Sequence, residues 1–393
     1  MGYGAFPGAR LMKRLKVQDL MVSDFMTRDV VWIDPADNLG EVLGRMKKHD
    51  VHELPAGRKG KLVGIVTMRQ LMKRHALPPT TKVSSVLTQA PEVTPKTTLP
   101  EAAELLIATG FRALPVMDRK KVAGMISRTD LVRALVQMES LEGLAVREFM
   151  TPNPQCVGED DTVDRAVHLM QSLGERSIPV VDRNRHLKGA IGMKDVAEYF
   201  ARPKRRERAG ERAGEESKVD IEVKGVMRYP PVTIGADGSL ARAAELMLQS
   251  NVSSVIVAEE DEPVGVVTKP DLMHFLAGLR TREQLFVEIG GLEEESQETY
   301  DLIYESIQKE IKRIAQLVTP TTLSLRVQKY KPDGDRWKYS LRLRLATTHG
   351  MYYANHFDWD LHMALKELLE TLYKRILKEK ERKVTERKLG RST

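Results

Sequence analysis

Hydrophobic and polar residues alternate almost without exception in the stretch W-K-Y-S-L-R-L-R-L, residues 337–345. A period of two is the spacing of a β-strand, because successive side chains of a strand point to opposite faces of its sheet. One face of this strand is therefore apolar, and the other carries Lys338, Ser340, Arg342 and Arg344. The pattern predicts a sheet with one buried face and one cationic face.

The surrounding segments predict a domain with the element order β-α-β-β-β-α over residues 284–384. A short strand at 285–291 precedes a helix with isoleucines at helical spacing, and further strands at 322–330 and 351–357 flank the alternating stretch. The hairpin turn K-P-D-G-D lies between two of these strands, and a long amphipathic helix follows the last one. Two helices can cover only one face of such a sheet, so the other face is expected to stay wet or to meet a partner.

A second pattern occurs four times ahead of this domain. The segments G-I-V-T-M-R-Q, G-M-I-S-R-T-D, G-A-I-G-M-K-D and G-V-V-T-K-P-D begin at residues 64, 124, 189 and 265. Each follows a helical stretch and a short apolar strand, and the Asp or Gln that ends it precedes another helical run. A unit of this size has too little core to be secure alone, so the repeats are expected to pair.

These segments resemble cystathionine-β-synthase (CBS) domains, which implies α/β repeats arranged as two pseudo-symmetric pairs, followed by the α+β domain. The expected copies span residues 17–77, 83–138, 146–200 and 222–278. A basic extension at 1–16 precedes them. A charged insert at 201–218, with 7 basic and 4 acidic residues, is expected to be a solvated linker, although its R-P-K-R-R-E-R portion could touch phosphate.

The resemblance implies that adenine nucleotide could bind the repeats. No ligand is expected to be required for folding. In CBS domains the hydroxyl and the carboxylate of the motif G-h-h-[S/T]-x-x-D contact the phosphate and the ribose of AMP, ADP or ATP, which suits a carboxylate because it accepts hydrogen bonds from ribose hydroxyls. The matching residues here are Thr67, Ser127, Asp130, Asp195, Thr268 and Asp271. Gln70 replaces the carboxylate in repeat one, and Gly192 replaces the hydroxyl in repeat three.

The aspartates of this motif also admit a purely structural interpretation. Asp130, Asp195 and Asp271 each precede an apolar helical run, so each is expected to be a helix N-cap worth about 1 kcal/mol without a ligand. Capping by the carboxylate alone would not need the hydroxyl. No nucleophile, general base or metal cluster accompanies these positions, so an enzyme is the least expected class.

Positive charge is concentrated near the end of the chain. From Pro320 onwards there are 17 Lys and Arg against 9 Asp and Glu, whereas residues 281–319 hold 4 against 9. Such a distribution favours a polyanionic partner, and a solvated surface is the alternative. The residues expected to contact RNA are Arg326, Lys329, Lys338, Arg342, Arg344, Lys374, Arg375, Lys378, Arg382 and Lys383, with a further basic tail at 385–393.

Two other groups of side chains are given structural roles. His349, His356 and His362 fit no metal-ligand spacing and are expected to cap and pack. Four aromatic residues could stack on bases, but packing in the core or at a helix entry is the expected role. They are Tyr352, Tyr353, Phe357 and Trp359.

The order, turns and basic strands of residues 284–384 resemble the ribosome hibernation-promoting and ribosome-associated inhibitor (S30AE-type) domain, as found in archaeal proteins with CBS repeats. This implies a non-enzymatic factor that binds 16S rRNA of the small ribosomal subunit, with the large subunit as a further contact, and that blocks mRNA and tRNA sites. The repeats would sense adenine nucleotide or self-associate.

Two rival hypotheses come from other classes. The first is a nucleotide-sensing CBS regulatory subunit that controls a partner enzyme or transporter, with the basic region as a docking surface. The second is a DNA-binding regulator, which no groove-entering helix supports. The lack of an 18-residue apolar run and of a convincing signal peptide predicts a cytoplasmic protein without a membrane partner.

Overall fold

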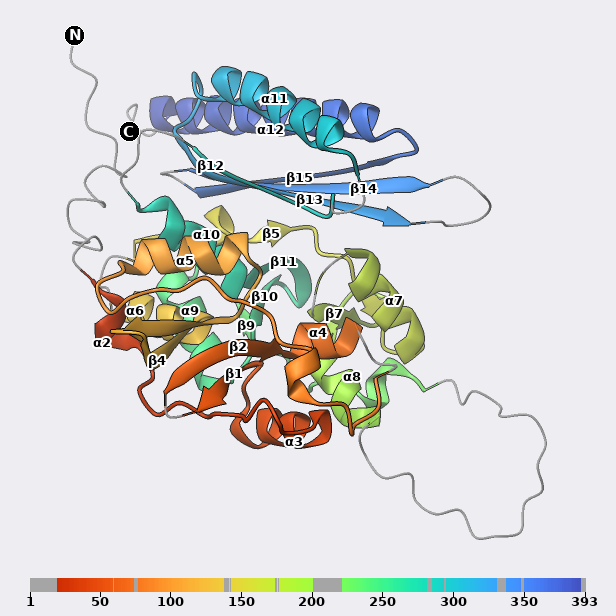
Figure 1. Ribbon diagram of the computed structural model, residues 1–393. Helices are drawn as coiled ribbons and strands as arrows, with labels where there is room; N and C mark the ends of the chain where they lie inside the picture. Colours follow the sequence, from red (N-terminus) through yellow and green to blue (C-terminus); the bar gives the residue numbers. More distant parts are fainter. Residues whose placement is uncertain are drawn as a thin grey trace, which may run out of the picture. The chain divides into compact units, whose positions relative to one another are not determined.

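The structure is a computed structural model that describes residues 20–58, 60–73, 77–137, 141, 143–173, 175, 177–200, 221–280, 285–292, 295–330, 337–347 and 350–389. The chain forms two compact units (Figure 1). One unit combines Met1–Leu141 with Lys269–Thr393, and the other is Glu142–Thr268. The predicted extension at 1–16, the insert at 201–218 and the final residues of the predicted tail lie outside the described residues.

Each repeat contains a short helical turn, a longer helix, an antiparallel hairpin and a closing helix, in that order. Repeat one has α2 (Val22–Phe25), α3 (Leu39–His49), β1 (Glu53–Arg58), β2 (Lys61–Thr67) and α4 (Met68–Lys73). Repeat two has η2 (Val83–Ser85), α5 (Leu99–Ala108), β3 (Ala113–Asp118), β4 (Lys121–Ser127) and α6 (Arg128–Val136). Repeat three has η4 (Val146–Glu148), β5 (Thr151–Pro152), β6 (Val157–Gly158), α7 (Val163–Leu173), β7 (Ser177–Val181), β8 (Leu187–Gly192) and α8 (Met193–Phe200). Repeat four has η5 (Val223–Gly225), β9 (Thr233–Ile234), α9 (Leu240–Gln249), β10 (Ser254–Glu259), β11 (Glu262–Thr268) and α10 (Lys269–Gly278).

Repeats one and two exchange backbone segments, which confirms that they pair. Thr27 lies in the segment that leads into repeat one, and it forms an antiparallel bridge with Met125 on β4 of repeat two. Thr88 lies in the segment that leads into repeat two, and it forms the reciprocal bridge with Ile65 on β2 of repeat one. In the other unit, β5 of repeat three pairs with β11 of repeat four in the same manner. Each hairpin therefore gains a strand partner from the neighbouring repeat.

The glycine that leads each repeated segment lies where the exchanged backbone crosses the hairpin. A Cβ atom added to Gly124 would lie 2.7 Å from the carbonyl oxygen of Thr27, and one added to Gly189 would lie 2.9 Å from that of Arg228. Gly64 is crowded by the backbone and side chain of the segment that enters repeat two, at 3.0–3.1 Å. Glycine is needed at these positions because the neighbouring backbone approaches closely.

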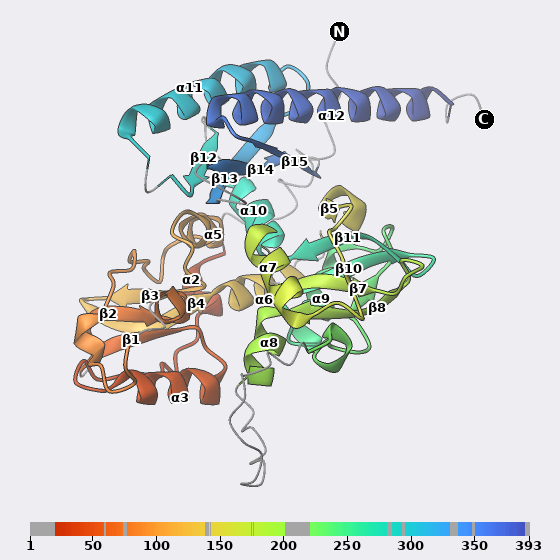
Figure 2. The same cartoon turned by 90° about the vertical axis from the view of Figure 1, so that its right-hand side faces the viewer.

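The remaining residues form a four-stranded sheet and two long helices in the predicted order. The elements are β12 (Phe286–Gly290), α11 (Gln297–Ile314), β13 (Pro320–Tyr330), β14 (Lys338–Thr347), β15 (Gly350–Asp358) and α12 (Leu361–Leu389). The strand order is β12-β13-β14-β15, with β12 parallel to β13 and the other neighbours antiparallel. Both helices cover the same face of the sheet (Figures 1 and 2).

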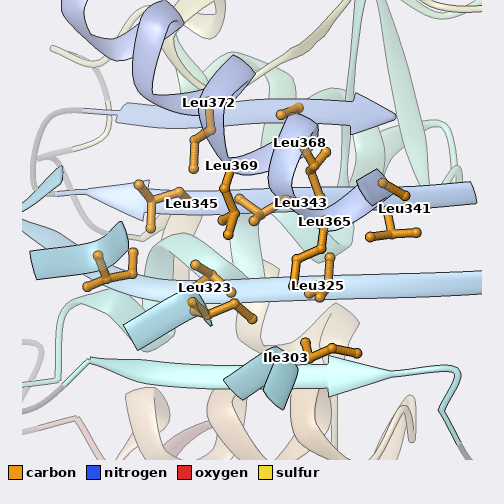
Figure 3. Packing of buried hydrophobic residues seen from close by; sticks show 14 of the residues in the cluster. Ile303, Leu323, Leu325, Leu341, Leu343, Leu345, Leu365, Leu368, Leu369 and Leu372 are labelled. Atoms are coloured by element: carbon orange, nitrogen blue, oxygen red, sulfur yellow. The ribbon is translucent and has the colours of Figure 1, made fainter. Parts of the chain in front are cut away.

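The covered face holds the core of this domain, as the alternating pattern predicts. The leucines of β13 and β14 interdigitate with those of α12, and α11 contributes Ile303 (Figure 3). The strand leucines that point to the helices are Leu323, Leu325, Leu341, Leu343 and Leu345. Among the described residues, no helix is long and apolar enough to cross a bilayer.

Helix α10 packs between repeat two and this sheet. It contacts α5 and α6 on one side and β13 and β14 on the other, and residues Asp271–Gly278 are all buried. Just beyond it, Arg280 forms ion pairs with Glu101 and Glu104 of α5, each at 2.9 Å. A helix that is apolar on every side is a buried helix. The second face of the sheet is therefore covered by α10 over part of its area, so that part meets another segment of the same chain.

Candidate functional site

The motif of repeat two forms a reciprocal helix cap. Ser127 is the N-cap residue of α6, and its Oγ accepts a hydrogen bond from the backbone N–H of Asp130 at 3.2 Å. In return, Asp130 Oδ2 accepts from the backbone N–H and from the hydroxyl of Ser127, at 2.9 and 2.6 Å. This arrangement is a capping box, in which the first and fourth residues satisfy each other's free backbone donors.

The expected N-cap role of the aspartates is therefore wrong in its detail. The hydroxyl residue is the cap, and the carboxylate stands three residues later and closes the box. Thr67 accepts from the backbone N–H of Gln70 at 3.1 Å, and Asp195 accepts from that of Gly192 at 2.8 Å. Capping accounts for both residues of the motif, so the hydroxyl alone does not argue for a ligand.

The Asp130 carboxylate has a further partner that the sequence reasoning missed. Arg133, one turn along α6, donates to Oδ1 at 2.7 Å, and its side chain is half-exposed while that of Asp130 is buried. At the start of β3, which pairs with the Ser127 end of β4, the buried Glu53 of β1 accepts from the backbone N–H of Arg112 at 3.1 Å. Glu53 and Arg112 could have been noticed in the sequence, because each is a charged residue directly before the apolar run of a strand.

The aspartate of repeat four is held by the C-terminal domain. Tyr353 on β15 donates its hydroxyl to Asp271 Oδ1 at 2.9 Å, and the Arg344 guanidinium on β14 lies 3.4 Å from the same oxygen. The Asp271 side chain is 0% exposed and that of Arg344 is 22% exposed. Arg344 therefore lies on the predicted face of the sheet, but it faces a buried carboxylate.

Other polar groups share this covered half of the sheet. Ser324 on β13 donates to the Glu288 carboxylate at 2.8 Å, and burial raises the pKa of Glu288 above its usual range. His274 on α10 is also buried, and burial, with smaller contributions from Arg344 and Arg128, lowers its pKa to about 3. His274 is consequently neutral at pH 7.

The other half of the same face is exposed and carries both cations and aromatic rings. Arg326 is exposed, and the Lys338 Nζ lies 4.3 Å from the ring centre of Phe357 and 5.5 Å from that of Trp359. Phe357 is 62% exposed and Trp359, which stands at the entry to α12, is 49% exposed, so neither is a core residue. The buried Tyr352 and Tyr353 do pack as expected.

The remaining predicted RNA contacts are spread over different surfaces. Lys329 points to the helix side of β13 and pairs with Glu295 at 2.9 Å. The exposed cations of α12 lie on the helix that covers the opposite face of the sheet from Arg326 and Arg342. These helix cations are Lys374, Arg375, Lys378 and Arg382, while the side chain of Lys383 lies outside the described residues. The structure thus places Arg326, Lys338, Arg342 and Arg344 on one face of the sheet, with Arg326 and Arg342 directly opposite each other on neighbouring strands.

Metal chemistry finds no support in the part of the chain that the structure describes. No group of three or more His, Cys, Asp and Glu side chains there could hold a metal ion.

The repeats match the CBS domain family model at residues 22–76, 83–137, 146–202 and 223–278. The chain belongs to the CBS domain family. The hairpin of each CBS repeat and its leading glycine are thus features of one domain type that occurs four times.

Two archaeal proteins are similar over most of the chain. Protein MJ1404 of Methanocaldococcus jannaschii is 24% identical over 384 residues, which is 90% of each chain. A 33.4 kDa protein in a ribosomal RNA operon of Thermofilum pendens is 24% identical over 69% of this chain and 88% of its own length. The crystal structure of MJ1225 from M. jannaschii, proposed as an archaeal homologue of g-AMPK, has a TM-score of 0.51 at 17% identity and covers 66% of this chain and 100% of its own. That likeness shows a shared fold for the CBS repeats.

Proposed function

We propose that this chain is a regulatory protein that senses adenine nucleotide through its CBS repeats, with no catalytic activity of its own. The observation that carries the proposal is the Ser127–Asp130 pair, because repeat two retains a hydroxyl and a carboxylate together with a half-exposed cation, Arg133. Membership of the CBS family and the fold shared with MJ1225, a proposed g-AMPK homologue, support it.

The contacts of Asp130 suggest how a ligand would bind. Ribose hydroxyls can donate to the lone pairs that the Asp130 carboxylate has left after capping, since each carboxylate oxygen accepts more than one hydrogen bond. Arg133 is half-exposed, so its guanidinium can turn from Asp130 towards a phosphate, to which it can donate two parallel hydrogen bonds. Nucleotide regulates the protein only if it binds two conformations with different affinity.

Titration of the full chain with AMP, ADP and ATP in a calorimeter tests this function. Asp130→Asn is expected to weaken binding about tenfold, which corresponds to about 1.4 kcal/mol and to the loss of a charged hydrogen bond. Asp118→Asn is the matched control, because Asp118 is an exposed aspartate of the same repeat. Absence of binding of all three nucleotides at millimolar concentration would contradict the proposal.

A second candidate function is RNA binding by the exposed half of the sheet, with the ribosome as the partner. The supporting observation is the surface formed by Arg326, Lys338 and Arg342 beside the exposed rings of Phe357 and Trp359. Cations suit phosphates, and aromatic faces suit unpaired bases. The relative from T. pendens, described by its place in a ribosomal RNA operon, is consistent with this candidate.

Co-sedimentation with small ribosomal subunits at low salt tests the second candidate. The double variant Arg326→Glu/Arg342→Glu is expected to reduce the bound fraction at least tenfold and to lower the slope of log K against log salt by about 1.5, at about 0.7 per phosphate contact. Arg183→Glu, at a 92% exposed arginine of the other unit, is the control. Equal sedimentation of the double variant and the control would exclude this surface.

A further inference from the structure

We infer that the C-terminal domain acts as an internal ligand of repeat four, so that a nucleotide at Asp271 and the docked sheet exclude each other. This inference rests on the proposed nucleotide-sensing function, and it adds the identity of the regulated partner. That partner is the chain's own β-sheet domain.

The contacts of Asp271 carry the inference. Asp271 occupies the position of the motif carboxylate in repeat four, and its Oδ1 accepts the Tyr353 hydroxyl at 2.9 Å and faces Arg344 at 3.4 Å. The two partners come from neighbouring strands, because Arg344 on β14 is paired in register with Tyr353 on β15. Arg375 of α12 donates to the Tyr353 carbonyl oxygen at 2.9 Å and ties this strand to the rest of the domain.

The chemistry of this contact matches that of a bound nucleotide. Tyr353 offers the carboxylate an O–H donor, as a ribose hydroxyl would, and Arg344 supplies the positive charge that stabilises a buried carboxylate. A ribose must come within about 3 Å of a carboxylate oxygen to form a hydrogen bond. Since the Asp271 side chain has no exposed surface, a ribose cannot reach its carboxylate oxygens while the sheet remains docked.

The equivalent position in repeat two is arranged differently. Asp130 takes its cation from Arg133 on its own helix, and that arginine is half-exposed. The Asp130 carboxylate therefore pairs with a cation of its own repeat, whereas the Asp271 carboxylate contacts residues of the C-terminal domain. A nucleotide at Asp130 would have to turn aside Arg133 of the same helix, whereas a nucleotide at Asp271 must displace Tyr353 and Arg344 of the C-terminal domain.

Displacement of the sheet would couple nucleotide binding at Asp271 to the exposure of the cationic sheet face. Docking lowers the apparent affinity at Asp271 by the fraction of molecules that are undocked, and nucleotide in turn raises that fraction. Release would also free the covered part of the sheet face, which adds Arg344 to the exposed Arg326 and the partly exposed Arg342. Nucleotide would thus change how much of the cationic face is available to a partner.

Calorimetric titration of the full chain with AMP, ADP and ATP tests this inference in an Asp130→Asn background, in which repeat two contributes little. Tyr353→Phe removes the donor but keeps the ring, and it is expected to tighten the remaining binding about tenfold. Arg344→Gln is expected to act in the same direction. Tyr352→Phe is the matched control, because Tyr352 is the neighbouring tyrosine on the helix-covered side of the same strand and should leave the affinity unchanged.

Hydrogen exchange provides the second measurement. Saturating nucleotide is expected to increase amide exchange in β15 and in α10 of the Asp130→Asn protein, and Asp271→Asn should abolish that increase. If the wild-type chain binds nucleotide but Tyr353→Phe and Arg344→Gln change neither affinity nor exchange, the internal ligand is excluded and the proposed function stands. If no variant and no wild-type protein binds nucleotide, the proposed function and the inference both fall.

Discussion

Replacing Leu343 by alanine is expected to destabilise the C-terminal domain by about 3 kcal/mol. Leu343 is 1% exposed and lies at the centre of β14, where it meets the leucines of α12 (Figure 3). Truncating a buried leucine removes its transfer free energy and leaves a cavity, which together cost about 2–5 kcal/mol in a well-packed core. The strand is bounded by β13 and β15 on either side, so the surrounding backbone has little freedom to collapse into the space.

Urea denaturation followed by tryptophan fluorescence measures this effect, because Trp337 and Trp359 both belong to the C-terminal domain. Leu302→Ala is the matched control, since Leu302 lies on α11 of the same domain but is 50% exposed. It is expected to change the free energy of unfolding by less than about 1 kcal/mol. Equal losses in the two variants would mean that β14 does not bury its leucines against the helices.

The sequence predicted which side chains of β14 point to the core, because alternation along a strand is a local property. Leu341, Leu343 and Leu345 must share one face whatever the strand packs against, and Arg342 and Arg344 must share the other. The four repeats could also be predicted from the sequence, because each leading glycine is required where the backbone of the paired repeat approaches closely. Both features follow from contacts that every strand or every repeat makes.

The difference between Arg342 and Arg344 could not be predicted in this way. The two residues have the same identity and lie on the same face of the same strand, yet it is Arg344 that forms an ion pair with the buried Asp271. That contact depends on where α10 meets the sheet, which is a matter of shape between two distant segments. The uniformly apolar run of α10 was a signal that both of its sides are covered, but it does not say by what.

The same limitation applies to the nucleotide motif. A hydroxyl and a carboxylate three residues apart satisfy a capping box and would also suit a ribose and a phosphate, so the sequence alone cannot separate the two roles. The structure shows that capping is present in repeat two and that the surroundings of the two complete motifs differ. Binding measurements on Asp130 and Asp271 therefore test separate questions.

Lowering the pH is expected to weaken the docking region of α10 through His274. This histidine is buried, its pKa is lowered to about 3 by burial and then by Arg344 of β14 and Arg128 of α6, and Asp271 lies one turn earlier on the same helix. The unfolded chain takes up a proton near pH 6.5, whereas the folded protein does so only near 3. Stability from neutral His274 is thus complete above pH 6.5 and is lost as the pH falls towards 3.

The free energies of unfolding at pH 8 and pH 5 measure this contribution. Each unit of pH between the two pKa values costs about 1.4 kcal/mol, so the wild-type chain is expected to lose about 2 kcal/mol more than His274→Gln over this interval. His362→Gln is the control, because His362 is an exposed histidine on α12 and should leave the wild-type dependence intact. Parallel pH profiles for the wild type and His274→Gln would show that His274 is not held neutral between repeat two and the sheet, and α10 would then not be buried on both sides.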